Sequence, residues 1–193
     1  MGKTRLEAFS DGVIAILITI MVLEFKTPEG HDWADIGALS TKFYAYILSF
    51  VFLGIYWNNH HHMFHVIKTV TGGILWANLH LLFWLSLVPF TTAWIGETGV
   101  APVPAALYGI VLLMAGVAYT ILVRVIIASQ GAHSTLKAAV GTDKKGWASI
   151  LLYAVAIPIA FGAPYVSAAI YACVAAMWLI PDRRIEKHLQ ELT

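Results

Sequence analysis

A chain of 193 residues in which 59% are hydrophobic and only 12% are charged is too apolar to be a soluble domain of this size. Its mean hydropathy is +0.75, and the segments 43–67, 69–96, 98–123 and 146–181 contain no Asp, Glu, Lys or Arg. The net charge of +1, without a basic block, gives no reason to expect a nucleic-acid partner, and the single cysteine, Cys173, excludes a disulfide framework. Each charge-free segment can cross a hydrocarbon layer of roughly 30 Å, and the last can cross it twice.

These segments, with the Pro and Gly residues between them, predict an all-α integral membrane protein with six transmembrane helices. In chain order we expect helices at about 4–25, 40–66, 74–95, 104–129, 146–161 and 164–180. Residues 1–193 are therefore predicted to form a single transmembrane domain. No small-residue cleavage site follows the apolar run of the first helix, so we expect this helix to be retained rather than removed as a signal peptide.

The basic residues predict which side of the membrane the termini occupy. Six spans put both termini on one side, and that side receives ten of the twelve Lys and Arg residues, leaving Lys26 and Lys42 on the other. The ten are Lys3, Arg5, Lys68, Arg124, Lys137, Lys144, Lys145, Arg183, Arg184 and Lys187. The positive-inside rule then predicts that both termini are cytoplasmic.

The first predicted helix combines an aliphatic stripe with a polar end. At 100° per residue, Ile16, Ile20 and Leu23 lie within about 60° of one another, and Thr19 lies beside them. Asp11 points roughly 140° away from Ile16. A carboxylate inside a membrane helix is costly without a partner or water, so Asp11 is a candidate functional residue; the alternative is a helix cap or a marker of the cytosolic end.

The loop after this helix is acidic, with Glu24, Glu29, Asp32 and Asp35 against Lys26. An aliphatic stripe alone predicts core or lipid contact. Two features favour pore lining: this helix alone combines the stripe with Thr19 and a polar cytoplasmic base, and the loop beside Leu23 is acidic. If several copies surround one axis, these loops would form a ring of negative potential that gathers cations.

The inner end of the second predicted helix, 57–65, is rich in histidine and asparagine. His61 and His65 are one turn apart, as two metal ligands on a helix would be, but no acidic residue stands among them and His80 is the only histidine on another span. We therefore expect no metal site, and expect one imidazole to turn inward and bond a group of the first helix such as Asp11. The chain also lacks a phosphate-binding loop, a catalytic triad and a zinc-protease motif, so we do not expect an enzyme.

Three short blocks stand in order within residues 5–90. They are Arg5-x-x-x-Phe9-Ser10-Asp11, then Trp57-x-x-His60-His61-x-x-Phe64, and then Asn78-Leu79 followed by Leu87-Val88-Pro89-Phe90. Together they resemble the motifs of the transmembrane protein 175 family, the lysosomal and bacterial potassium channels. Beyond residue 90 the resemblance is only one of topology, and the length fits the bacterial members.

This resemblance implies a homotetrameric channel in the inner (plasma) membrane of a bacterium, moderately selective for potassium among monovalent cations, without a carbonyl filter or a cofactor. It implies that the first helix of each copy lines the pore, with the constriction at Ile16, further aliphatic rings at Ile20 and Leu23, and a hydroxyl layer at Thr19. It also implies a polar network that holds the first helix against the second and third. The network residues are Arg5, Phe9, Ser10, Asp11, Trp57, His60 and Asn78.

Two other functions remain open at this point. A proton-coupled secondary transporter could use Asp11 and His60 as a relay, and would show saturable flux coupled to proton movement. A membrane metalloenzyme built on residues 60–65 would retain a metal when purified.

Overall fold

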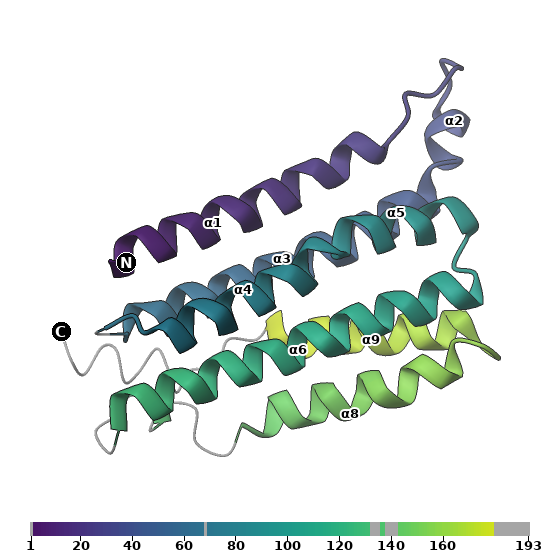
Figure 1. Ribbon diagram of the computed structural model, residues 1–193. Helices are drawn as coiled ribbons and strands as arrows, with labels where there is room; N and C mark the ends of the chain where they lie inside the picture. The colour runs from purple at the N-terminus through teal and green to yellow at the C-terminus, as the bar shows by residue number, and fades with distance from the viewer. Residues whose placement is uncertain (1, 68, 132–135, 138–142, 180–193) are drawn as a thin grey trace.

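The structure is a computed structural model that describes residues 2–67, 69–131, 136–137 and 143–179. These residues form α-helices, without a strand among them (Figure 1). The helices are α1 (Lys3–Ile20), α2 (Trp33–Gly37), α3 (Ser40–His65), α4 (Gly72–Ser86), α5 (Val88–Thr98), α6 (Pro102–Gln130), α8 (Lys144–Ile159) and α9 (Pro164–Leu179). The predicted all-α class is confirmed.

Two predicted helices differ from the observed ones. The first ends at Ile20 and tightens into a 3₁₀ turn, Met21–Glu24, where we expected a helix to residue 25. The third is two helices, α4 and α5, because Pro89 has no N–H to continue the α-helical bonding and begins a new helix instead. The short α2 lies in the acidic loop, where the Asp35 carboxylate accepts a bond from the Asp32 N–H at 2.9 Å and closes a capping box.

The long helices run side by side, with α1 along one edge of the bundle and α8 along the opposite edge (Figure 1). One group of buried apolar side chains joins α1 to α3, α4 and α6, and a second joins α3, α5, α6, α8 and α9. Because α1 packs on one side alone, its other side is uncovered in the single chain.

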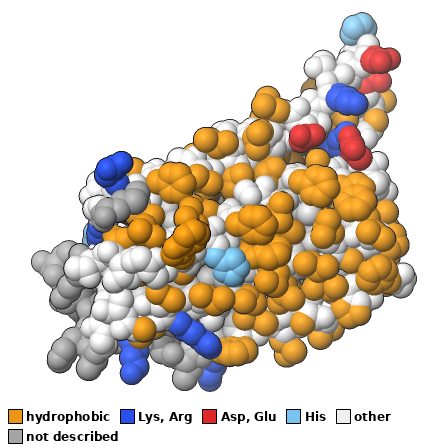
Figure 2. All heavy atoms as spheres, viewed as in Figure 1, with side chains coloured by type: hydrophobic (Ala, Val, Ile, Leu, Met, Phe, Trp, Pro, Cys, Tyr) orange, Lys and Arg blue, Asp and Glu red, His pale blue; other side chains and the backbone are white. Residues whose placement is uncertain are grey.

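Three stretches are long and apolar enough to cross a membrane: Lys3–Glu24, Gly72–Thr98 and Pro102–Gln130. The surface between the two ends is largely hydrophobic, and acidic side chains gather at the end that carries α2 (Figure 2). Six spans and cytoplasmic termini stay predictions. Some residues on which these two predictions depend lie outside the described part of the chain: Lys68, Ile180, Arg183, Arg184 and Lys187.

Candidate pore-lining helix and its polar base

The helix α1 has two faces of opposite character. The buried residues of α1 follow the four- and three-residue spacing of one helix side: Leu6, Ser10, Ile14 and Leu17. The three apolar ones pack against α3, α4 and α6. On the other side, Ile16 is 62% exposed and Leu23 is 77% exposed in the single chain. Contact with lipid or with further copies of the chain would remove this aliphatic surface from water.

The exposed face extends over the whole helix. Ile20, 44% exposed, continues the line from Ile16 towards Leu23, and Phe9 and Arg5 continue it towards the N-terminus. Arg5 and Ile16 are eleven residues apart, which is close to three full turns. Arg5 and Phe9 therefore share a face with the predicted constriction rather than with the residues that hold α1 to the bundle.

Thr19 lies on this exposed face with its hydroxyl directed along the helix. Its Oγ1 donates to the carbonyl oxygens of Ala15 and Ile16, at 2.9 and 3.1 Å. A hydroxyl has one proton and two lone pairs, so the lone pairs remain available to water or a cation on the exposed side.

A buried chain of hydrogen bonds ties the other face of α1 to α4 and α3. The Asn78 Nδ2 group donates to Ser10 Oγ at 2.9 Å, and His60 Nε2 lies 2.8 Å from Asn78 Oδ1. All three side chains are fully buried. Three polar side chains, one from each of three helices, thus meet inside the apolar core.

The donor and acceptor of each bond follow from the hydrogen bond that Ser10 makes at one end of this series. Ser10 Oγ donates its proton to the carbonyl oxygen of Leu6 at 2.9 Å, so it can only accept from Asn78. Asn78 must then present its amide N–H₂ to Ser10 and its oxygen to His60, which makes His60 Nε2 the donor. The His60 ring stacks on Phe64 with centroids 4.1 Å apart, and its Nδ1 is buried without a hydrogen-bond partner among the described residues.

A second set of contacts joins α1 to α3 in three successive turns. Lys3 Nζ donates to the carbonyl oxygen of His65 at 2.8 Å, Glu7 Oε1 lies 3.5 Å from His61 Nδ1, and Trp57 Nε1 donates to Asp11 Oδ1 at 3.1 Å. From one contact to the next the residue number rises by four on α1 and falls by four on α3, as expected for two antiparallel helices. The contacts fix the rotation of α1 and hence the direction of its exposed face.

The structure therefore divides the predicted network residues into three groups. The buried series of hydrogen bonds contains Ser10, His60 and Asn78. A separate hydrogen bond joins Trp57 to Asp11. Neither set of contacts includes Arg5 or Phe9. Sequence reasoning missed the contacts of Lys3 and Glu7. The available signal was the four-residue spacing of polar side chains on both helices.

The histidine-rich end of α3 does not gather around one point. His60 turns into the core while His61 turns to Glu7 on the surface. Within the described residues, no group of three or more His, Cys, Asp or Glu side chains is placed to hold a metal ion. Asp11 and His60 bond to different partners, Trp57 and Asn78, so no hydrogen bond joins the two residues of the predicted proton relay.

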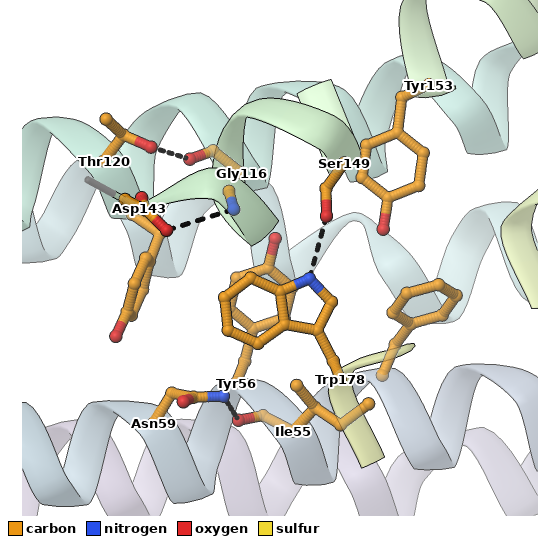
Figure 3. A pocket seen from close by; sticks show the side chains of 12 residues that line it. Ile55, Tyr56, Asn59, Gly116, Thr120, Asp143, Ser149, Tyr153 and Trp178 are labelled. Atoms are coloured by element: carbon orange, nitrogen blue, oxygen red, sulfur yellow. Dashed lines mark hydrogen bonds between the residues drawn. The ribbon is translucent and has the colours of Figure 1, made fainter. Parts of the chain in front are cut away.

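A cavity of about 50 Å³ lies on the other side of α3, between α6, α8 and α9 (Figure 3). Polar groups at its wall already have partners: Trp178 Nε1 donates to Ser149 Oγ at 2.8 Å, and Asn59 and Thr120 donate to carbonyls of their own helices. This volume holds a few water molecules at most. Since α1 contributes nothing to its wall, the cavity is not part of the exposed stripe.

Comparison with known proteins identifies relatives over the whole chain. The family model described as endosomal/lysosomal potassium channel TMEM175 matches residues 5–89. A protein named as a potassium channel from Chryseobacterium sp. (strain P1-3) is 56% identical over 191 residues, which cover 99% of this chain and 100% of that protein. Another so named, from Streptomyces collinus, is 37% identical over 123 residues, or 60% of each protein.

A solved structure has the same fold. It is the crystal structure of a lysosomal potassium-selective channel TMEM175 homolog from Chamaesiphon minutus, with a TM-score of 0.81 and 27% sequence identity. The alignment covers 93% of this chain and 97% of that one. Like the relatives above, that protein is a channel and not an enzyme.

Proposed function

Because this chain belongs to the TMEM175 family, we propose that it forms a potassium-permeable cation channel as a homotetramer, with α1 of each copy lining a shared central pore. The observation that carries this proposal is the orientation of α1. Ser10 and Asp11 bond inward to α4 and α3, while the aliphatic side chains of Ile16, Ile20 and Leu23 are left uncovered. Four such faces around one axis would bury one another.

Aliphatic rings would form the ion barrier in this arrangement. Ile16 and Ile20 lie about 6 Å apart along α1 at 1.5 Å per residue, and Leu23 follows in the 3₁₀ turn Met21–Glu24. A narrow aliphatic passage excludes water and therefore ions, and a small outward movement of α1 would admit a hydrated column. Potassium gives up hydration water at less cost than sodium, so selectivity arises without a carbonyl filter and stays moderate.

The proposed topology has six spans, cytoplasmic termini and a location in the inner membrane of a bacterial cell. The 26 residues of α3 are about 39 Å long, enough to cross despite their polar inner end. Helices α8 and α9 have 16 residues each, about 24 Å, and would cross as a pair joined by a short turn. The ions that pass are the only small-molecule partners we propose, and no cofactor is required.

Reconstitution of the full chain in proteoliposomes tests the function directly. We expect unitary currents whose reversal potential follows the potassium gradient, because a pore conducts many ions without a transport cycle. Flux that saturates and moves with protons would instead support the transporter that uses Asp11 and His60, for which the separate partners of these residues give no support.

Replacing Thr19 with valine tests the hydroxyl layer. The two side chains have nearly the same shape, so assembly and conductance should persist. We expect the potassium-to-sodium permeability ratio to fall about threefold, which corresponds to roughly 0.6 kcal/mol, because the ring of hydroxyls would no longer bond to the water or ion that passes it. Reversal potentials under bi-ionic conditions measure the ratio, and Thr98→Val, on an exposed helix end outside the proposed pore, is the control. An unchanged ratio in Thr19→Val would remove the hydroxyl layer from the selectivity mechanism.

A further inference from the structure

Two polar side chains on the outer surfaces of the proposed spans have unused hydrogen-bonding groups in the described part of the single chain. His80 lies on the outer side of α4 among Trp76, Leu79 and Phe83, all of them exposed. Asn58 is exposed on the outer side of α3. Asn58 lies seven residues from the inner end of α3 and His80 lies eight residues from the inner end of α4, about two helical turns in each case.

The protonation of His80 follows from its neighbour one turn away. Trp84 Nε1 donates to His80 Nε2 at 2.9 Å, and an indole nitrogen can only donate. His80 Nε2 is therefore the unprotonated nitrogen of a neutral ring, and Nδ1 carries the proton. Within the described chain this N–H has no acceptor, and lipid tails supply none.

Asn58 is the matching acceptor in chemical terms. Its side chain makes no hydrogen bond with the described residues, whereas the adjacent Asn59 donates to the carbonyl oxygen of Ile55 at 2.8 Å. Once another helix covers it, a free amide oxygen has the same need for a partner as a free N–H.

The two side chains lie at the same depth but on opposite sides of the α3–α4 pair. The His60–Asn78 bond sets one level of these antiparallel helices. Asn58 and His80 are each two residues further outward, about 3 Å along the axis. Two residues are also about 200° around a helix, so each side chain points away from that bond, Asn58 beyond α3 and His80 beyond α4.

We propose that successive copies pack head to tail around the pore, with His80 Nδ1–H of one copy donating to the Asn58 amide oxygen of the next. The inference rests on the proposed channel assembly and identifies the surface that closes it. Rotation about an axis along the helices preserves depth, so neighbouring copies present these two groups to each other at one level. A polar contact of this kind is typical of helix interfaces inside membranes.

The apolar surroundings of the two groups are complementary in shape. On α4, Phe83 follows His80 by three residues and projects from the surface. On α3, Gly54 precedes Asn58 by four residues, and a Cβ placed on it would meet nothing within 4 Å. The Phe83 ring and the open space at Gly54 therefore lie at nearly the same level, which suits the close approach that small residues permit.

Cysteine cross-linking in native membranes tests this interface. The exposed Cys173 is first replaced by serine, and the full chain then carries Asn58→Cys together with His80→Cys. A short bismaleimide is used because a histidine–asparagine contact leaves the two Cβ atoms further apart than a disulfide allows. We expect a ladder of two, three and four linked copies, and monomers alone from either single variant. Monomers from the double variant, or dimers from a single variant, would overturn the proposal.

A matched pair and a second measurement complete the experiment. Asn58→Cys with Leu151→Cys, the latter 65% exposed on α8, should give no ladder, and an equal ladder there would mean random collision.

Separately, His80→Ala and Asn58→Ala should each lower the fraction of oligomer kept in mild detergent. The double variant should lose no more oligomer than either single variant, and additive losses would count against a direct contact. Potassium flux on the same membranes separates the two proposals: flux without a ladder rejects this interface alone, and a ladder without flux rejects the channel.

Discussion

Replacing Ile16 with asparagine should raise the resting potassium conductance about tenfold, which corresponds to a barrier lowered by roughly 1.4 kcal/mol, and should reduce the preference for potassium over sodium. The amide group bonds to water, so the narrowest ring of the proposed pore would stay wet instead of excluding water. A wet ring also demands less dehydration from sodium, which removes part of the discrimination. Single-channel recording and bi-ionic reversal potentials measure the two effects.

Leu151→Asn is the matched control for this change. Leu151 is about as exposed as Ile16 in the single chain, but it lies on α8, at the opposite edge of the bundle from α1 (Figure 1). The same kind of substitution there should leave conductance and selectivity unchanged. If Ile16→Asn assembles normally and conducts no better than the unmodified protein, Ile16 faces lipid or a neighbouring helix, and the barrier lies elsewhere.

The direction of the α1 stripe was predictable because it depends on one helix alone. Ile16, Ile20 and Leu23 share a face of any straight α-helix, and the structure leaves that face uncovered. What the face meets was not predictable from the residues, since lipid, a pore and another helix all accept aliphatic side chains. The interpretation as a pore came from the family resemblance, and membership of the family is now confirmed by the comparisons.

The polar base of α1 shows the opposite case, because contacts between helices depend on their relative rotation and height. The residues alone do not show that Ser10, His60 and Asn78 meet. The family resemblance groups them in one network but leaves the choice among neighbouring histidines open. The break between α4 and α5 was missed for a different reason. An apolar run hides it, and Pro89 was its one local sign.

Replacing Asn78 with alanine should destabilise the protein more than any other single change at the base of α1. It leaves the His60 N–H buried without an acceptor and Ser10 without a donor, and each such group costs about 1–3 kcal/mol. For a chain of this length we expect the unfolding midpoint in detergent to fall by roughly 5–10 °C. The fluorescence of the seven tryptophans follows the transition.

Asn59→Ala provides the comparison, because its amide bonds only to a carbonyl of its own helix and its removal strands no other side chain. We expect a much smaller fall in the midpoint. Equal falls in the two variants would mean that the chain of bonds through Asn78 contributes nothing beyond the loss of one side chain.

Replacing all three side chains of the buried hydrogen-bond series separates its effect on protein stability from its effect on the orientation of α1. With Ser10→Ala, His60→Leu and Asn78→Leu together, no polar group is left stranded, so much of the lost stability should return. Apolar side chains, however, do not specify one rotation of α1 as directed hydrogen bonds do. We therefore expect the triple variant to regain its unfolding temperature while its potassium leak stays raised, because the aliphatic rings would no longer point at the axis in register. Recovery of both properties would instead mean that the contacts of Lys3, Glu7 and Asp11 with α3 are sufficient to hold the pore closed.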